Sequence, residues 1–293
     1  MAKTVVVTGA GRGIGQATAL LLARRGLDVI GTVRTAEKAD RLRAAARAQG
    51  TGLRTVLLDL RDPEGCVRAM DACASMAGGT PWALVNNAAI ALAGAVADPA
   101  EERIREILEV NVLAPARLAR LLLPGMRARH AGRIVNVSSV AGRLSTPFFG
   151  WYCASKHALK VISHALRMEE RRHGIAVVLV EPGIVDTGIW SRSVGRLEEQ
   201  RNSPFAEQYA QAGGVVRAAS RRPGPERVAH AVHRALAAPH PHARYPVGHE
   251  ARWLPVLESL TPLPLRDYAK EVALGLRDAP PGVRDALRYW RTR

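Results

Sequence analysis

The chain has 293 residues, 47% of them hydrophobic and 4% aromatic, which is the composition of a globular protein able to bury a full core. The net charge of +16 comes from 42 basic and 26 acidic residues, but the basic residues are scattered and no aromatic residues interleave with them. This pattern argues against a nucleic-acid partner. We find no secretory leader and no run of about 18 apolar residues, so we expect a soluble, cytoplasmic protein with no membrane span. Cys66, Cys73 and Cys153 lack metal-ligand spacing, so we expect buried thiols and no metal.

Apolar runs of strand length alternate with amphipathic runs of helix length from residue 3 to about residue 249. The expected strands are 3–9, 28–34, 53–60, 82–89, 132–139, 175–183 and 243–248. The expected helices are 13–26, 35–50, 62–78, 101–129, 151–174 and 226–239. Nearly continuous apolar strands that alternate with helices predict an α/β fold, a single doubly wound, Rossmann-like parallel sheet.

Two further segments are distinguished by their pattern. Residues 187–225 have weak periodicity and several Gly and Pro residues, which predicts a substrate lid within a catalytic domain of residues 1–249. Residues 250–293 are helical in pattern and interrupted by prolines. We expect them to form a helical C-terminal extension packed on the same domain.

A glycine-rich stretch, TGAGRGIG from Thr8 to Gly15, follows the first expected strand. Glycine allows positive φ and close approach of the backbone to a ligand, and the following helix offers free N–H groups to a phosphate. The spacing does not match the GxGxxG fingerprint literally, but it is typical of a dinucleotide pyrophosphate site after a first strand.

Five motifs in this order resemble the short-chain dehydrogenase/reductase family: TGxxxGxG, NNAA at 86–89, NVSS at 136–139, Tyr152 with Lys156, and PG at 182–183. The resemblance extends over about residues 3–249. It is strongest to the subgroup that contains hydroxysteroid and retinol dehydrogenases and bacterial ketone reductases. One departure is Ala89, where the family usually has glycine.

The resemblance implies a catalytic set of Asn111, Ser139, Tyr152 and Lys156. A ketone that accepts hydride develops alkoxide charge and needs a proton donor, the role implied for Tyr152. Lys156, one helical turn away, is expected to lower the tyrosine pKa, and the family pattern has it bind the nicotinamide ribose, so Tyr152 and Lys156 also count as cofactor residues. Ser139 would orient the carbonyl, with Ser138 as the competing choice. Asn111 would hold a water in the proton relay.

The expected cofactor is NADP(H). At the end of the second strand, Val33 takes the position of the acid that binds the ribose of NAD, and Arg34 follows it, while Arg12 adds a positive charge from the glycine loop. The remaining cofactor positions implied by the resemblance are Gly9, Gly13, Ile14, Gly15, Asp59, Leu60, Asn86, Ala88, Pro182, Gly183, Ile184 and Thr187.

The substrate side is apolar and aromatic, with few charges. Candidates for its walls, or equally for lid packing, are Leu144, Phe148, Phe149, Trp151, Ile189, Trp190, Phe205 and Tyr209. We therefore expect an NADP(H)-dependent oxidoreductase that interconverts a hydrophobic ketone and a secondary alcohol. A non-catalytic NADP(H) sensor or scaffold and an NAD-dependent dehydrogenase are the alternatives. The family pattern also implies a homodimer or homotetramer.

Overall fold

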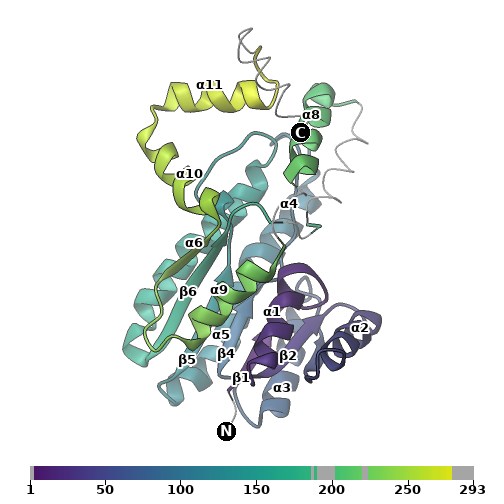
Figure 1. Cartoon of the computed structure of the whole chain (residues 1–293), viewed down its shortest axis with the longest axis vertical. Coiled ribbons are helices and arrows are strands. Elements are labelled where there is room, and N and C mark those ends of the chain that lie inside the picture. The colour runs from purple at the N-terminus through teal and green to yellow at the C-terminus, as the bar shows by residue number, and fades with distance from the viewer. Residues whose placement is uncertain (1–2, 186–187, 190–201, 220–223, 279–293) are drawn as a thin grey trace.

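The computed structural model describes residues 3–185, 188–189, 202–219 and 224–278. Within these residues, seven parallel strands form one sheet in the order β3-β2-β1-β4-β5-β6-β7 (Figure 1). The strands are β1 (Thr4–Val7), β2 (Asp28–Val33), β3 (Arg54–Leu57), β4 (Ala83–Asn86), β5 (Gly132–Val137), β6 (Ile175–Pro182) and β7 (Arg244–Val247). The predicted doubly wound parallel sheet is confirmed.

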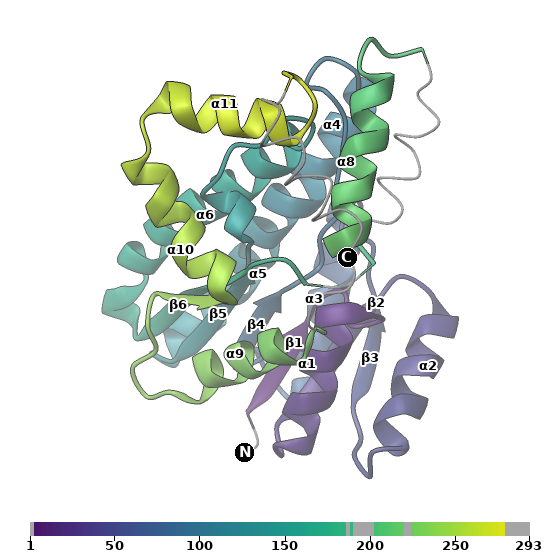
Figure 2. The same ribbon diagram turned by 45° about the horizontal axis from the view of Figure 1, so that its top comes forward.

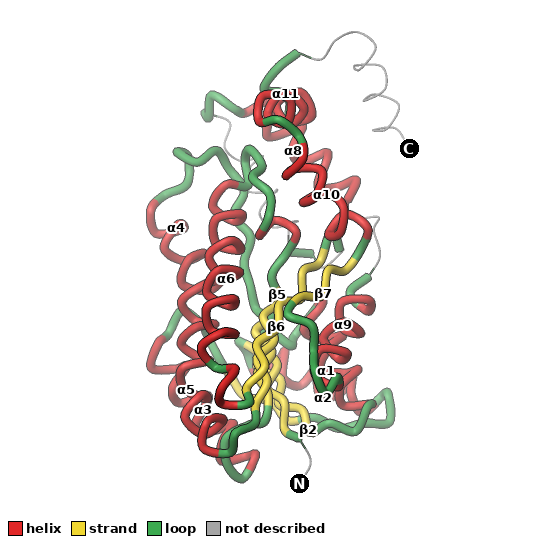
Figure 3. Tube along the Cα trace, turned by 90° about the vertical axis from the view of Figure 1, so that its left-hand side faces the viewer, coloured by secondary structure: helices red, strands yellow, loops and turns green. Residues whose placement is uncertain are grey.

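Helices cover both faces of the sheet (Figure 3). One face carries α1 (Gly13–Arg24), α2 (Ala36–Arg47) and α9 (Glu226–Ala237), and the other carries α3 (Pro63–Ala77), α4 (Glu101–Leu108), α5 (Ala114–Ala128) and α6 (Gly150–Glu169). Successive strand residues point to opposite faces, so Val5 and Val7 pack with α1 and α9 while Val6 packs with α3 and α5. This two-sided burial explains the continuous apolar runs of the strands.

Three helices lie beyond the sheet (Figure 2): α8 (Ala206–Ala219), α10 (His249–Leu260) and α11 (Leu263–Ala273). The last two agree with the helical pattern expected after residue 249. Part of the predicted lid, including Thr187 and Trp190, lies outside the described residues, as do residues 279–293. No described helix is both long and apolar enough to cross a membrane.

The structure differs from the sequence prediction in two elements. The strand expected at 53–60 is ordered as β3 only over Arg54–Leu57, and Leu58 to Leu60 leave the sheet toward α3. The helix expected at 101–129 is interrupted by a π-helical turn, η1 (Glu109–Leu113), between α4 and α5. Short 3-10 turns, η2 (Val140–Gly142) and η3 (Arg171–His173), complete the described elements.

The strand order reverses between β1 and β4. From β1 the chain moves outward through β2 to β3, and then crosses back to place β4 on the other side of β1. The loops that follow β1 and β4 therefore part in opposite directions and leave a crevice at the carboxyl ends of these strands, the usual ligand position in such sheets. Both TGAGRGIG and NNAA lie at this point.

Candidate active site

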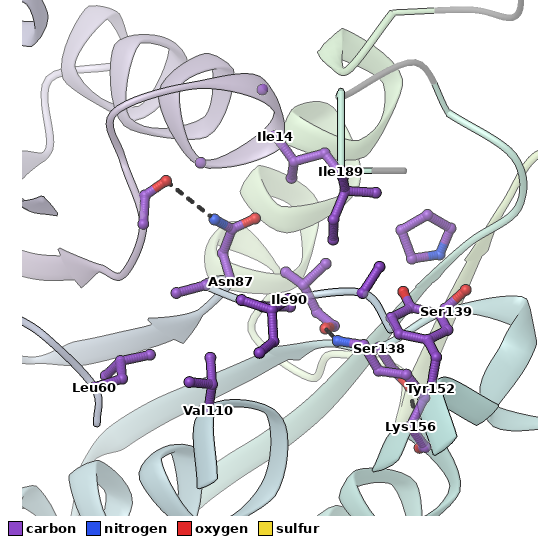
Figure 4. Close-up of a pocket in the computed structure, with 18 of the residues that line it drawn as sticks. Ile14, Leu60, Asn87, Ile90, Val110, Ser138, Ser139, Tyr152, Lys156 and Ile189 are labelled. Carbon is purple, nitrogen blue, oxygen red and sulfur yellow. Dashed lines mark hydrogen bonds between the residues drawn. The ribbon is translucent and has the colours of Figure 1, made fainter. Parts of the chain in front are cut away.

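A cavity of about 520 Å³ opens at the carboxyl ends of the strands (Figure 4). Its walls come from the glycine loop, the ends of β2, β4 and β5, the loop after β6, and α6. Most of the residues implied by the family resemblance meet here: Gly9, Arg12, Gly13, Ile14, Gly15, Arg34, Asp59, Leu60, Ala88, Ser139, Tyr152, Lys156, Pro182, Gly183 and Ile184. The elements that were distant in sequence thus form one site.

The glycine loop is shaped to bring its backbone close to a ligand. Gly9 and Gly13 have φ of +67° and +54°, backbone angles that residues with a Cβ rarely adopt. A Cβ on Gly15 would lie 2.3 Å from the Gly9 carbonyl oxygen, so only glycine lets α1 pack against the turn. The N-cap residue, Arg12, makes no side-chain cap, and the first N–H groups of α1 remain available to an anion.

Asn87 holds the ends of β1 and β4 together at the floor of the cavity. Its Nδ2 donates to the Thr8 carbonyl oxygen over 2.8 Å, and its backbone N–H donates to Thr8 Oγ1 over 2.9 Å. The backbone N–H of Ala88 donates to the same hydroxyl over 3.0 Å. This link fixes the position of both loops that line the crevice.

Asn86, which the resemblance placed at the cofactor, faces away from the cavity. Its side chain is buried on the other side of β4, where Nδ2 donates to Asn136 Oδ1 over 2.9 Å and to the Pro115 carbonyl oxygen over 3.3 Å. Because side chains alternate along a strand, Asn87 points into the cavity instead. Asn87, and not Asn86, is therefore the asparagine of this motif that lines the cavity.

Basic side chains surround the end of the cavity formed by β2 and β3. Arg12, Arg34, Lys38 and Arg61 all line it, and no carboxylate stands at the end of β2, where Val33 is buried. Asp59 and Glu106 are the acids of the cavity lining, and the bond of Asp59 to Arg61 (2.5 Å) holds the pKa of the Asp59 carboxyl below the usual value. Lys38 and Arg61 were not among the residues predicted from the sequence; Lys38 could have been found from its place in the first turn of the helix that Thr35 caps.

Tyr152 and Lys156 lie on consecutive turns of α6, and Ser139 follows β5 (Figure 4). The Lys156 Nζ donates to the Val137 carbonyl oxygen over 3.1 Å and lies 5.9 Å from the centre of the Tyr152 ring. Ser139 is hydrogen-bonded to Tyr152, whereas the Ser138 hydroxyl is directed to the Lys156 backbone carbonyl, 3.5 Å away. The geometry thus favours Ser139 over Ser138 as the partner of Tyr152.

Burial, more than the neighbouring lysine, sets the proton affinity of Tyr152. It raises the pKa of Tyr152 to about 12, with the Ser139 hydrogen bond acting in the opposite direction. Burial also lowers the pKa of Lys156 to about 8. Both shifts have the same cause, because both groups are removed from water and both charged forms are disfavoured; the expected lowering of the tyrosine pKa by Lys156 stays a prediction.

The π-helical turn η1 turns the side chain of Asn111 toward the loop after β4. Asn111 Oδ1 accepts from the Ile90 backbone N–H, and its Nδ2 donates to the Ile90 carbonyl oxygen, both over 2.9 Å, and to Ser155 Oγ over 3.0 Å. The side chain is buried and does not line the cavity. Its contacts fasten the cavity loop to α6, and a part in a water relay stays a prediction.

The substrate-side prediction separates into two groups of residues. Leu144, Phe149 and Ile189 line the cavity. Phe148, Phe205 and Tyr209 instead pack against one another in a separate cluster, and Trp151 donates from its indole N–H to the Val96 carbonyl oxygen over 3.0 Å.

The three cysteines are buried thiols, as expected. The described residues contain no group of side chains that could hold a metal ion.

The fold and the glycine loop are those of a dinucleotide-binding protein, and a tyrosine and a lysine line the same cavity. Comparison with known proteins agrees: residues 3–196 match the short chain dehydrogenase family. The chain belongs to the short-chain dehydrogenase/reductase family and is an oxidoreductase.

Several relatives are similar over most of the chain. "Uncharacterized oxidoreductase YbbO" of Escherichia coli is 34% identical over 89% of this chain and 91% of its own length. The NADPH-dependent 3-dehydrocapnine reductase of Ornithobacterium rhinotracheale is 33% identical over 84% and 88%, and human 17-beta-hydroxysteroid dehydrogenase type 1 is 33% identical over 88% and 80%. The predicted likeness to hydroxysteroid dehydrogenases is confirmed.

Among solved structures, a short-chain dehydrogenase/reductase from Burkholderia phymatum in complex with NAD aligns with a TM-score of 0.74. It is 28% identical, and the alignment covers 96% of this chain and 97% of that one. Together with the NADPH-dependent relative, it supports a nicotinamide dinucleotide as the cofactor of this family member.

Proposed function

We propose that the chain is an NADP(H)-dependent reductase that interconverts a hydrophobic ketone and its secondary alcohol. The observation that carries this proposal is the meeting of Ser139, Tyr152 and Lys156 in one cavity with the glycine loop at its far end. The loop fits a dinucleotide, because its positive-φ glycines and free N–H groups can approach a pyrophosphate.

The preference for NADP(H) is supported by charge. Arg12, Arg34 and Lys38 line the adenosine end of the cavity, and Val33 stands where an acid would bind the ribose of NAD. Guanidinium and ammonium groups attract a 2′-phosphate, and Arg34 can bind it through two parallel hydrogen bonds. Leu144, Phe149 and Ile189 give the opposite end apolar walls suited to a hydrophobic carbonyl compound.

The glycine loop and Lys156 would hold NADPH, and the chemistry it would supply when bound is a hydride for the carbonyl carbon. Ser139 donates a hydrogen bond that orients the carbonyl, and Tyr152 donates its hydroxyl proton to the oxygen that becomes the alcohol. Because its pKa is raised to about 12, Tyr152 is protonated at neutral pH and ready to donate. The working direction follows the ratio of reduced to oxidised cofactor, and a preference for NADP(H) favours reduction.

The test is an assay of NADPH consumption over a panel of hydrophobic ketones and diketones. We expect turnover with NADPH, much weaker turnover with NADH, and loss of turnover in Tyr152→Phe with NADPH affinity retained. Tyr245→Phe is the matched control, because Tyr245 lies on β7, away from the cavity. A wild-type protein that binds NADPH tightly but reduces no member of the panel would contradict the proposal and favour a sensor or scaffold.

A further inference from the structure

Tyr209 of α8 is fully buried outside the cavity and makes two hydrogen bonds with one loop. Its hydroxyl donates to Asp98 Oδ2 and accepts from the backbone N–H of Ala95 over 2.8 Å. Ser203 Oγ also donates to Asp98 Oδ2, over 2.6 Å. Since burial and the Asp98 carboxylate raise the pKa of Tyr209, its hydroxyl remains a donor at neutral pH. These bonds join α8 to the loop of residues 91–98.

The same loop holds the beginning of the catalytic helix. The Gly94 backbone N–H donates to the Phe148 carbonyl oxygen over 2.8 Å, and the Trp151 indole N–H donates to the Val96 carbonyl oxygen over 3.0 Å. Phe148 and Trp151 flank the start of α6, the helix that carries Tyr152. A continuous set of hydrogen bonds thus runs from α8 through the loop to the catalytic helix.

Phe148 has a backbone conformation that requires support. Its φ is +64°, in the left-handed region that bulky residues avoid. Its ring packs edge-on against Tyr209, with centroids 5.3 Å apart, and against Phe205, with centroids 5.7 Å apart. The aromatic residues of α8 and its N-terminal turn therefore hold Phe148 in this conformation, from which the next residue, Phe149, reaches the cavity wall.

The opposite side of α8 is supported by α11. Gln211 Nε2 donates to the Ala273 carbonyl oxygen over 3.1 Å, and Leu274 packs in the same apolar cluster as Phe148 and Tyr209. The cluster is separate from the two core clusters under the sheet. Its position therefore depends on local contacts, and the Tyr209 hydroxyl is the polar group of the cluster that bonds to the 91–98 loop.

We propose that Tyr209 and Asp98 form a latch that docks α8 on the 91–98 loop, fixes Phe149 in the cavity wall, and so determines the size of carbonyl compound that the cavity accepts. The inference rests on the proposed function in taking an apolar carbonyl compound as the occupant. Tyr209 is a positioning residue, because it acts on the substrate through Phe148 and Phe149 and not by contact.

The first test removes only the hydroxyl, in Tyr209→Phe. Hydrogen exchange of the Ala95 amide reads the latch directly and needs no activity. We expect this amide, deprived of its acceptor, to exchange about tenfold faster or more. Tyr245→Phe, which removes a hydroxyl that accepts from the His242 backbone N–H at the β7 edge, should leave Ala95 unchanged.

The second readout is the ratio of the dissociation constants of the NADPH-loaded protein for a one-ring and a two-ring aryl ketone, measured by calorimetry. In Tyr209→Phe we expect this ratio to change about fivefold or more in favour of binding the two-ring ketone, because the cavity wall at Phe149 is less firmly held. The NADPH dissociation constant should not change. Asp98→Asn keeps an acceptor oxygen for the Tyr209 and Ser203 hydroxyls and should retain much of the wild-type ratio. Asp98→Ala has no such acceptor and should behave as Tyr209→Phe.

The outcomes separate the latch from the proposed function. Unchanged Ala95 exchange in Tyr209→Phe would overturn the latch, and faster exchange with an unchanged ketone ratio would overturn its effect on the cavity. A wild-type protein that binds NADPH but neither ketone would overturn the proposed function and the size selection with it, while Ala95 exchange would still decide whether the latch exists.

Discussion

Lys156 is buried at a cost in stability, because an ammonium group loses its hydration inside the protein. Its pKa is lowered from an ordinary 10.5 to about 8, so between these values the unfolded chain binds more protons than the folded one. Stability therefore rises with pH through this window, and the cost is present in full below pH 8. We expect Lys156→Met to stabilise the cofactor-free protein at pH 7 by up to about 3 kcal/mol and to abolish reduction.

Urea unfolding at pH 7 and pH 10 tests this prediction. The gain from Lys156→Met should shrink toward pH 10, where the folded lysine has lost its proton and no longer carries a buried charge. Titration of Tyr152 does not affect the stability difference between pH 7 and pH 10. Because the tyrosine pKa is raised on folding, its titration lowers the stability of the fold only above pH 10. Lys160→Met is the matched control on the same helix, and since Lys160 is only partly buried its gain should be smaller. A destabilised Lys156→Met protein at pH 7 would show that the Val137 hydrogen bond outweighs the burial cost.

The basic residues at the end of β2 allow a second prediction at this scale. We expect Arg34→Gln and Lys38→Gln each to weaken NADPH binding about ten- to hundredfold, the usual effect of losing a charged hydrogen bond, and to leave NADH binding nearly unchanged. Arg61→Gln is the control, because Arg61 is already paired with Asp59. Fluorescence titration with both cofactors gives the values. Equal losses for NADPH and NADH would mean that these side chains only shape the cavity.

The π-helical turn η1 links the loop after β4 to α6 through Asn111. Asn111 satisfies both backbone groups of Ile90, which are otherwise buried beside the cavity. We expect Asn111→Ala to destabilise the fold by about 2–3 kcal/mol, since a donor and an acceptor lose their partners. Ser155→Ala removes only one neighbour of Asn111 and should cost less than about 1 kcal/mol. Chemical denaturation of both variants measures the difference, and similar costs would show that η1 does not depend on the Ile90 bonds.

The elements show how far sequence patterns reach. Strand and helix positions followed from apolar periodicity, and the order of motifs brought Ser139, Tyr152 and Lys156 to one place, because the carboxyl ends of parallel strands share an edge. The π-helical turn could not be read from periodicity, since one extra residue in a helical ladder leaves the apolar pattern nearly intact. The choice between Asn86 and Asn87 depended on where β4 ends, which a pattern fixes only to within a residue or two.

Among the exposed apolar side chains of the described residues, two pairs lie on helices at the surface. On α6, Val161 and Met168 are 62% and 63% exposed and lie two turns apart on one side of the helix. On α10, Trp253 and Leu257 are 63% and 57% exposed, one turn apart. The family pattern predicts subunit contacts through the helices that carry Asn111 and Tyr152, which favours the α6 surface as the interface of a homodimer or homotetramer.

We expect the double variant Val161→Glu, Met168→Glu to form a smaller assembly than the wild type, because carboxylates buried in an apolar interface destabilise it. Light scattering after gel filtration measures the mass of the assembly. The matched variant Trp253→Glu, Leu257→Glu replaces two apolar residues of similar exposure on α10, and its assembly should have the same mass as that of the wild type. If only the α10 variant dissociates, the interface lies on the C-terminal extension instead. If the wild type is itself a monomer, the family expectation is wrong for this chain. Because α6 holds Tyr152 and Lys156 on its buried side, dissociation should also lower the thermal midpoint of unfolding, with NADPH affinity less affected.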